Sequence, residues 1–338
     1  MLEFNEICIG VSTYNGEKTL ERTLKCLEDQ TFKNFSVFIS DDKSTDNTLD
    51  IIKSFSRRNK NFYFEINEKN LGMILNNNKV FKKSNSKYFA WLDQDDYRDK
   101  DFLKECYNTL EANPNASLVF PNTGVVNKKD NILMHINTIK SIENENDIYK
   151  RYKNLLNNFH DTIIYSLIRT SSLKNTSLWT DINGSANRLI FELVLEGEFL
   201  AVNKLLSFYS GRGLKNRFNP DVEFFRQSKY KKKFYQLPFL MLFFSQLKDV
   251  INKKLKFYFK IRLIVLLIFN FLKVNTLKLL YRFFSKIFFG KLDNYIYKLI
   301  LKIVPENKDI NQIVNKKLYN DFYPTHYPFK KVEGITND

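Results

Sequence analysis

The chain has 338 residues with 53 Lys and Arg against 37 Asp and Glu, a formal net charge of +16, and its length suits one large domain or two ordinary ones. Its 43% hydrophobic and 15% aromatic residues exclude a disordered chain. The three cysteines are too scattered for a disulfide framework or a CxxC metal site, and the three histidines lack the short pairing of zinc ligands. We therefore expect a reducing compartment.

The positive charge is concentrated in one part of the sequence. Residues 1–221 hold 30 basic and 29 acidic side chains, residues 222–305 hold 18 and 3, and residues 306–338 hold 5 and 5. An excess of this size is typical of proteins that bind nucleic acid or an anionic membrane surface. We predict a near-neutral domain over 1–221, a basic segment over 222–305 and a C-terminal tail over 306–338.

Strand and helix signals alternate through the first two-thirds of the sequence. The first ten residues read as the approach to a strand and not as a basic-then-apolar signal peptide. Apolar runs predict strands, and helical spacing of apolar residues predicts helices between them. The expected strands are 7–11, 35–39, 62–66, 88–92 and 117–120, and the expected helices 20–27, 49–55, 73–83 and 99–111. This order predicts an α/β fold with a mostly parallel sheet and helices on both faces.

Two more elements are predicted before the basic segment. Residues 125–136 have the pattern of a hairpin that turns at 128–131. Residues 186–196 have the pattern of a helix that ends at Gly197.

The basic segment interleaves Lys and Arg with Phe, Leu, Ile and Tyr. Its longest apolar stretches are Leu237–Phe244 and Leu263–Leu272, well short of the roughly 20 residues that span a membrane. We expect amphipathic helices that lie in a membrane interface. The alternative is a packed helical subdomain whose lysines face solvent.

Three polar clusters follow predicted strands, at residues 12–16, 41–46 and 93–96. Open α/β sheets bind ligands beyond the carboxyl ends of their strands, so we expect the clusters to meet at one edge. Asp46 is equally well explained as a helix cap.

The third cluster has the composition of a cation site. Its three carboxylates within four residues, Asp93, Asp95 and Asp96, repel one another. Oxygen ligands without nearby His or Cys suit Mg²⁺ or Mn²⁺, which commonly bridge to substrate phosphates. A solvated loop is the alternative. The sequence has no GxxxxGK[ST] or GxGxxG motif, which argues against P-loop nucleotidases and classical dinucleotide dehydrogenases.

The ordered motifs VSTYN, SVFISDDKSTDNT, NEKNLG and YFAWLDQDD, over about residues 5–125, resemble those of family-two glycosyltransferases of the GT-A fold. The resemblance implies that Ser12 and Tyr14 line the nucleoside pocket. It implies that Asp42 accepts a hydrogen bond from the ring N–H of a uridine-type base. Asp95 and Asp96 would form the DxD-type site for ribose, Mn²⁺ or Mg²⁺ and diphosphate, with Asp93 at its outer end. Asn78 stands where the family has an Asn after NLG, and Asn77 where it often has Arg.

The same resemblance implies an inverting reaction, which needs a carboxylate base to deprotonate the acceptor hydroxyl. The family often carries this acid ten to twelve positions before the glycine that ends the 186–196 helix. The chain has Asn187, Ala186 and Ser185 there, and an amide cannot act as a base. Asp181 and Asp161 are the nearest substitutes and His160 is a further one, while Asp181 is also explained as a cap or loop residue.

The leading hypothesis is metal-dependent transfer of a sugar from a nucleotide-sugar, UDP-linked, to a glycan or lipid-linked acceptor. The setting would be bacterial surface-glycan assembly (lipopolysaccharide or capsule) in the cytoplasm. Segment 222–305 would bind the anionic inner face of the plasma membrane, and a homo-oligomer is compatible with the sequence. Two alternatives are an inactive family member that acts as a scaffold and a nucleic-acid-binding protein; apolar runs in place of isolated stacking aromatics argue against nucleic acid.

Overall fold

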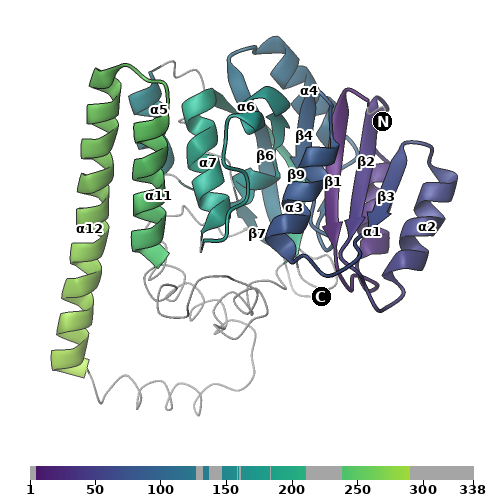
Figure 1. Cartoon of the computed structure of the whole chain (residues 1–338), viewed down its shortest axis with the longest axis horizontal. Helices are drawn as coiled ribbons and strands as arrows, with labels where there is room; N and C mark the ends of the chain where they lie inside the picture. The colour runs from purple at the N-terminus through teal and green to yellow at the C-terminus, as the bar shows by residue number, and fades with distance from the viewer. Residues whose placement is uncertain are drawn as a thin grey trace, which may run out of the picture.

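The computed structural model describes residues 5–126, 132–136, 147–157, 159, 161–182, 184–210 and 238–289. Its described strands form a nine-stranded sheet in the order β3-β2-β1-β4-β8-β6-β9-β5, with β7 paired to β6. Helices cover both faces of this sheet (Figure 1). The α/β fold predicted from the sequence is therefore confirmed.

The parallel half of the sheet is formed by the first four strands. They are β1 (Ile7–Thr13), β2 (Phe35–Asp41), β3 (Phe62–Ile66) and β4 (Tyr88–Trp91). The pairs β1–β2, β2–β3 and β1–β4 are all parallel. Every residue of β2 is buried, as expected of a central strand covered on both faces. The predicted strands at these positions are confirmed.

Four amphipathic helices alternate with these strands. They are α1 (Leu20–Glu28), α2 (Thr48–Arg58), α3 (Met73–Lys83) and α4 (Phe102–Ala112). Apolar residues of α1, α2 and α4 belong to the core on one face of the sheet, and Val80 and Phe81 of α3 belong to the core on the other. The helices predicted at these positions are therefore confirmed, each with one face buried against the sheet.

The second half of the sheet mixes strand directions. It contains β5 (Tyr97–Arg98), β6 (Ala116–Val126), β7 (Ile132–Ile136), β8 (Leu167–Arg169) and β9 (Glu198–Ser210). Strand β8 lies antiparallel between β4 and β6, whereas β6 and β9 are parallel. Antiparallel pairing of β6 with β7 confirms the predicted hairpin, whose turn at 128–131 lies outside the described residues.

The described residues between β7 and β9 form four more helices. They are α5 (Ile148–Asn157), the 3₁₀ helix η2 (Asp161–Tyr165), α6 (Thr170–Lys174) and α7 (Ser185–Glu196). Helix α7 confirms the predicted 186–196 helix. Gly197 then follows with an extended backbone, so a left-handed cap is not its role. A Cβ there would lie 2.6 Å from the Asn115 carbonyl oxygen, and glycine permits this close approach.

Two long helices, α11 (Pro238–Asn252) and α12 (Phe257–Phe289), lie side by side beyond α7 and α5 (Figure 1). Val250, Leu263 and Leu267 are buried in the core that also contains α7. The inner faces of both helices are thus packed, as the alternative of a helical subdomain anticipated. In the described parts of the chain, no helix offers a stretch long and apolar enough to cross a membrane. The predicted boundary at 222 and the tail over 306–338 lie outside the described residues.

Candidate functional site

The first and third polar clusters meet through a single amide, that of Gln94. Its Oε1 accepts hydrogen bonds from Thr13 Oγ1 at 2.5 Å and from the Tyr14 N–H at 2.9 Å. Its Nε2 donates to the Tyr14 carbonyl oxygen at 3.1 Å. The loops after β1 and β4 are therefore fixed to each other at the carboxyl edge of the sheet, where the sequence predicted a shared site.

The second cluster joins the first through the side chain of Asn15. Its Oδ1 accepts from the Thr45 N–H at 2.9 Å, and its own N–H donates to Ser44 Oγ at 2.9 Å. The Gly16 N–H donates to Thr48 Oγ1 at 2.7 Å. All three predicted clusters therefore lie together. Asp46 accepts from the Thr48 N–H at 3.0 Å, but it stands one residue before Asn47, which is the N-cap of α2.

Asp42 is 3% exposed and organises the NEKNLG segment. Its Oδ1 accepts from Asn67 Nδ2 and from the Leu71 N–H, both at 2.7 Å, and its Oδ2 accepts from the Gly72 N–H at 2.8 Å. An ionised carboxylate has about four acceptor positions, so these three bonds leave one. A single ring N–H is the kind of donor that one position can accept.

Tyr14, Ser12 and Asn78, which were also predicted to bind the nucleotide, differ in their exposure and in their hydrogen-bond partners. Tyr14 is 38% exposed, and Ser12 Oγ donates to Asn77 Oδ1 at 2.6 Å. Asn78 is engaged elsewhere, because its Nδ2 donates to the Trp179 carbonyl at 2.7 Å and its Oδ1 accepts from the Trp179 N–H at 3.0 Å. In this structure Asn78 therefore positions the loop before α7.

The carboxylates of the third cluster have different surroundings. Asp96 is 1% exposed and accepts from the Ser210 N–H at 2.8 Å. Burial, and then the charges of Asp93 and Asp95, raise the pKa of Asp96 well above its usual range. Asp93 is half-buried and accepts from Tyr165 Oη at 2.5 Å. A positive charge in this cluster would relieve the repulsion that raises the pKa of Asp96.

The donor set suits a hard divalent cation in its chemistry. Asp93 and Asp95 are half-buried carboxylates, the oxygen ligands that Mg²⁺ and Mn²⁺ prefer. Among the described residues, however, no three His, Cys, Asp or Glu side chains converge on one point. The predicted set Asp93, Asp95 and Asp96 is therefore not assembled as a three-ligand cage. It fits an ion held by one or two carboxylates and by substrate phosphates.

The segments that carry the candidate bases contact either β4 or the cluster that follows it. Trp179, two residues before Asp181, packs edge-on against Trp91 of β4 with ring centroids 5.8 Å apart. The bond from Tyr165 to Asp93 holds η2, which begins at Asp161, against the same cluster. Asn187 is 7% exposed in the first turn of α7. His160 lies outside the described residues.

Three contributors to the site were missed from sequence. Gln94 lies within the motif YFAWLDQDD. Nothing in the sequence indicates that its amide joins the loop after β4 to the loop after β1. Tyr165 and Trp179 belong to segments without a motif, and their contacts join positions 72 and 101 residues apart.

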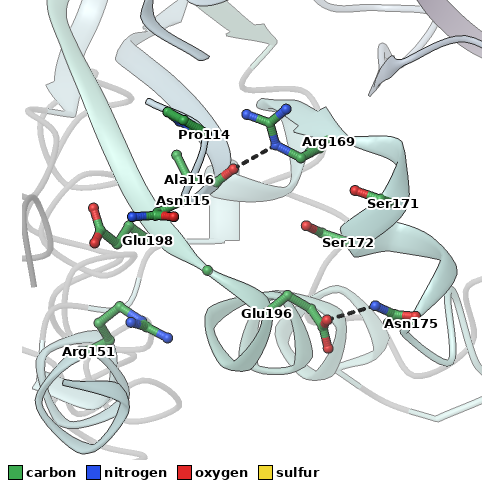
Figure 2. Close-up of a pocket in the computed structure, with 11 residues that line it drawn as sticks. Pro114, Asn115, Ala116, Arg151, Arg169, Ser171, Ser172, Asn175, Glu196 and Glu198 are labelled. Carbon is green, nitrogen blue, oxygen red and sulfur yellow. Dashed lines mark hydrogen bonds between the residues drawn. The ribbon is translucent and has the colours of Figure 1, made fainter. Parts of the chain in front are cut away.

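A cavity of about 440 Å³ lies at the other edge of the sheet, where β6 and β9 begin (Figure 2). Its two arginines are engaged by the protein: Arg169 Nε donates to the Ala116 carbonyl at 3.0 Å, and Arg151 Nε to the Val194 carbonyl at 3.3 Å. Glu196 and Glu198 also line the cavity, and Glu196 accepts from Asn175 Nδ2 at 2.9 Å. None of the predicted site residues lines this cavity.

The family model of glycosyl transferase family 2 matches residues 8–176, which are half of the chain. The matched range includes all three polar clusters, at residues 12–16, 41–46 and 93–96. The chain belongs to this family. Membership in this family is what the motif resemblance implied.

Curated relatives agree with this assignment. An uncharacterized glycosyltransferase of Methanocaldococcus jannaschii is 27% identical over 169 residues, which are 49% of this chain and 56% of the relative. The GalNAc(5)-diNAcBac-PP-undecaprenol beta-1,3-glucosyltransferase of Campylobacter jejuni is 24% identical over 60% of this chain and 64% of its own length. The chain thus spans less than two thirds of either relative.

Solved structures extend the likeness to the fold. S. aureus TarS 1-349 in complex with UDP-GlcNAc superposes with a TM-score of 0.59 at 18% sequence identity, covering 79% of this chain and 73% of TarS 1-349. This similarity confirms the GT-A fold that the sequence predicted.

Proposed function

We propose that this chain is a glycosyltransferase that moves a sugar from a UDP-linked donor to a glycan or lipid-linked acceptor, with inversion, in the assembly of a bacterial surface polysaccharide such as lipopolysaccharide or capsule. One observation carries the proposal: the loops after β1, β2 and β4 meet at one sheet edge, where Gln94 joins Tyr14 to the Asp93–Asp96 cluster. This is the edge at which open α/β sheets bind ligands.

The donor base would lie between the loops after β1 and β2. Asp42 has one acceptor position left for a uracil N–H, and the partly exposed Tyr14 ring offers a face for stacking. Ser12 contributes a hydroxyl on the same strand end. The structural neighbour TarS is described in complexes with UDP-GlcNAc and with UDP, which favours a uridine donor for this chain as well.

The diphosphate would lie against Asp93, Asp95 and Asp96, which would hold Mn²⁺ or Mg²⁺. A bound divalent cation supplies positive charge to the leaving diphosphate. The chain's own contribution is orientation: Tyr165 fixes Asp93, and the Ser210 N–H fixes Asp96. Arg22 Nη2 donates to the Asp95 carbonyl at 2.7 Å and holds the loop itself.

The acceptor hydroxyl would be deprotonated by Asp181 or Asp161. Asp181 follows the loop that packs on Trp91, and Asp161 begins the helix that Tyr165 ties to Asp93. The base must lie on the side of the sugar opposite the leaving group. One segment contacts β4 and the other contacts Asp93 in the cluster that follows β4, which supports either residue for this role.

The acceptor class is supported by the names of relatives. Those from Campylobacter jejuni and Methanococcus voltae are described as acting on undecaprenol- and dolichyl-linked saccharides. A lipid-linked acceptor would place this chain at the inner face of the plasma membrane, where the basic segment 222–305 would bind anionic lipid.

The test is a transfer and donor-hydrolysis assay with UDP-, GDP- and dTDP-sugars, with Mn²⁺ and with chelator. We expect turnover with one UDP-sugar, its loss in chelator and its loss in Asp96→Ala. Full activity in chelator or in Asp96→Ala would overturn the proposed site.

A second candidate function is a binding or scaffold role without catalysis, motivated by Asn187 in place of an acid. Calorimetry distinguishes the two, because a scaffold would bind UDP-sugar without turnover on any acceptor.

A further inference from the structure

Helix α12 exposes a continuous apolar face to solvent. Its outward residues follow one another at helical spacing through four turns. Their exposed fractions range from 42% to 79%, and they are Phe257, Tyr258, Ile261, Val265, Ile268, Phe269 and Leu272. We call this set the outer face of α12. A helix that is apolar on its outside needs a partner there.

The opposite face of the same helix already has its partner. Leu263 and Leu267 are 0% and 2% exposed, and Ile264 and Leu266 pack beside them on the core that includes α5 and α7. The expected amphipathic helix, with a charged side in water, is therefore not what α12 forms between 257 and 272. The side of α12 that was expected to be charged and solvated is instead apolar and packs against the domain.

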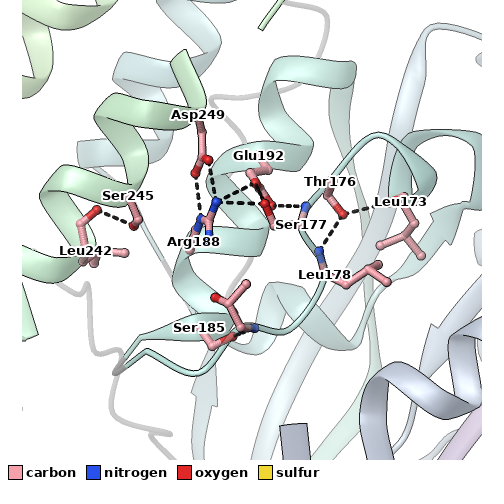
Figure 3. A network of polar contacts seen from close by, with 11 residues as sticks. Leu173, Thr176, Ser177, Leu178, Ser185, Arg188, Glu192, Leu242, Ser245 and Asp249 are labelled. Carbon is pink, nitrogen blue, oxygen red and sulfur yellow. Dashed lines mark hydrogen bonds and ion pairs between the residues drawn. The ribbon is translucent and has the colours of Figure 1, made fainter. Parts of the chain in front are cut away.

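Polar contacts hold these helices in a fixed position on the domain. Arg188 of α7 donates from Nη2 to Asp249 Oδ1 of α11 at 2.6 Å and from Nε to Oδ2 at 2.9 Å (Figure 3). The two side chains are only 13% and 12% exposed. Lys253, just after α11, pairs with Glu196 of α7. The bidentate Arg188–Asp249 ion pair fixes α11 on α7, and α12 packs in turn on α11 and α5, so the outer face of α12 is presented in a defined direction.

The charges around the outer face are all positive. Residues 250–292 contain ten Lys or Arg and no Asp or Glu. Lys254, Lys256 and Lys273 are exposed. Arg262, beside the outer face, lies 4.1 Å and 5.2 Å from the ring centroids of Tyr149 and Tyr258. An apolar stripe with cationic margins is complementary to an anionic lipid surface.

We propose that the outer face of α12 is a membrane-docking surface that inserts into the interface of an anionic lipid bilayer. The inference deepens the proposed function, on which it rests, because it assigns the lipid contact to named side chains next to a domain that would use a lipid-linked acceptor. A second copy of the chain is a poorer partner for this face. Two such faces would bring like charges together with no acidic residue of the 250–292 segment to pair them.

The experiment is co-flotation of the full chain with vesicles of phosphatidylcholine and with vesicles that also contain phosphatidylglycerol. We expect binding to the anionic vesicles, and a loss of about tenfold or more in Phe269→Asp, because one inserted Phe is removed. Lys273→Gln should weaken binding about fivefold. The matched controls are Leu75→Asp, at a residue 57% exposed on α3, and Lys104→Gln, exposed on α4; both should bind like the unmodified chain.

Three results would overturn the proposal: no binding to anionic vesicles, unchanged binding of Phe269→Asp, or a dimer of the unmodified chain that Phe269→Asp dissociates. Circular dichroism and the Tm of each variant show whether it is folded. Donor hydrolysis in solution is measured on the same samples, so loss of the proposed enzyme activity is seen separately from loss of lipid binding.

Discussion

In the α/β part of the chain, strands β1, β2 and β4 bury their apolar residues and end in polar clusters, whereas helix α12 buries one apolar face and exposes another. The α/β part is nearly neutral, and the segment that contains α11 and α12 carries most of the excess positive charge. The net charge of +16 therefore describes the surface beside the proposed sugar-transfer site and not the site itself.

The largest effect should come from the acceptor base, which belongs to the α/β part alone. We expect either Asp181→Asn or Asp161→Asn to lower kcat about 10²- to 10⁴-fold with the Kd for UDP unchanged. Steady-state kinetics and calorimetry measure the two quantities. Asp50→Asn, at an exposed carboxylate on α2, is the control. Normal kcat in both variants would show that neither residue is the base.

Removal of a carboxylate from the third cluster should be the next largest effect. Asp95→Ala should lower donor turnover about 10²- to 10³-fold, because charge stabilisation of the leaving group is lost. The measurement is hydrolysis of the active UDP-sugar in Mn²⁺. Unchanged turnover in Asp95→Ala would show that this carboxylate does not take part in donor cleavage.

The Arg188–Asp249 pair tests whether the two parts fold as one unit. Arg188→Met should cost about 3 kcal/mol of unfolding free energy, since it leaves Asp249 and Glu192 buried without their cation. Urea denaturation measures this change. The double variant Arg188→Met/Asp249→Leu should recover most of the loss. If Arg188→Met is neutral, α11 is not held to α7 by this pair.

The bridge through Gln94 should have a smaller effect, confined to the donor. Gln94→Ala removes three hydrogen bonds to Thr13 and Tyr14, each typically worth about 1 kcal/mol. Because part of this loss is also felt by the protein without UDP, we expect UDP binding to weaken about tenfold. Calorimetry checks the affinity. Gln94→Ala should bind anionic vesicles normally. Weaker vesicle binding by this variant would contradict the assignment of donor binding and lipid binding to separate parts of the molecule.

The smallest expected effect is a pH dependence from Glu28 of α1. Its burial works in the opposite direction, but hydrogen bonds from Asn59, Arg58 and Lys25 outweigh it and lower the pKa of Glu28 to about 2. A lowered pKa contributes stability above pH 4.5 that is lost as the pH falls from 4.5 through 2. Because Arg58 and Lys25 are exposed, we expect about 1 kcal/mol.

The measurement is unfolding free energy against pH for Glu28→Gln and for the exposed control Glu21→Gln. The loss of stability toward low pH should shrink in the first variant only. Equal profiles would show that Glu28 contributes nothing.

The elements predicted from sequence were those with a continuous local signal. Strands β1 to β4 and helix α3 are apolar runs or clear helical patterns bounded by polar turns. Strands β5 and β8 are two and three residues long, too short to show a period. Strand β9 is interrupted by the exposed Asn203 and Lys204, so its pairing with β6 could be seen only in three dimensions.

The site followed the same rule. Its three clusters were predictable because the carboxyl ends of parallel strands share an edge. The engagement of Asn78 with Trp179 was not predictable, because it depends on a loop that returns 101 residues later. The outer face of α12 was also not predictable from sequence. The sequence suggested one apolar and one polar face, whereas in the structure one apolar face packs on the domain and a second apolar face is exposed.

The most direct test of this account measures donor hydrolysis and anionic-vesicle binding side by side in two variants, Asp95→Ala and Phe269→Asp. We predict that Asp95→Ala loses hydrolysis and keeps vesicle binding, and that Phe269→Asp keeps hydrolysis and loses vesicle binding. If either folded variant loses both properties, or if Phe269→Asp loses hydrolysis alone, the separation of donor chemistry from lipid docking is contradicted.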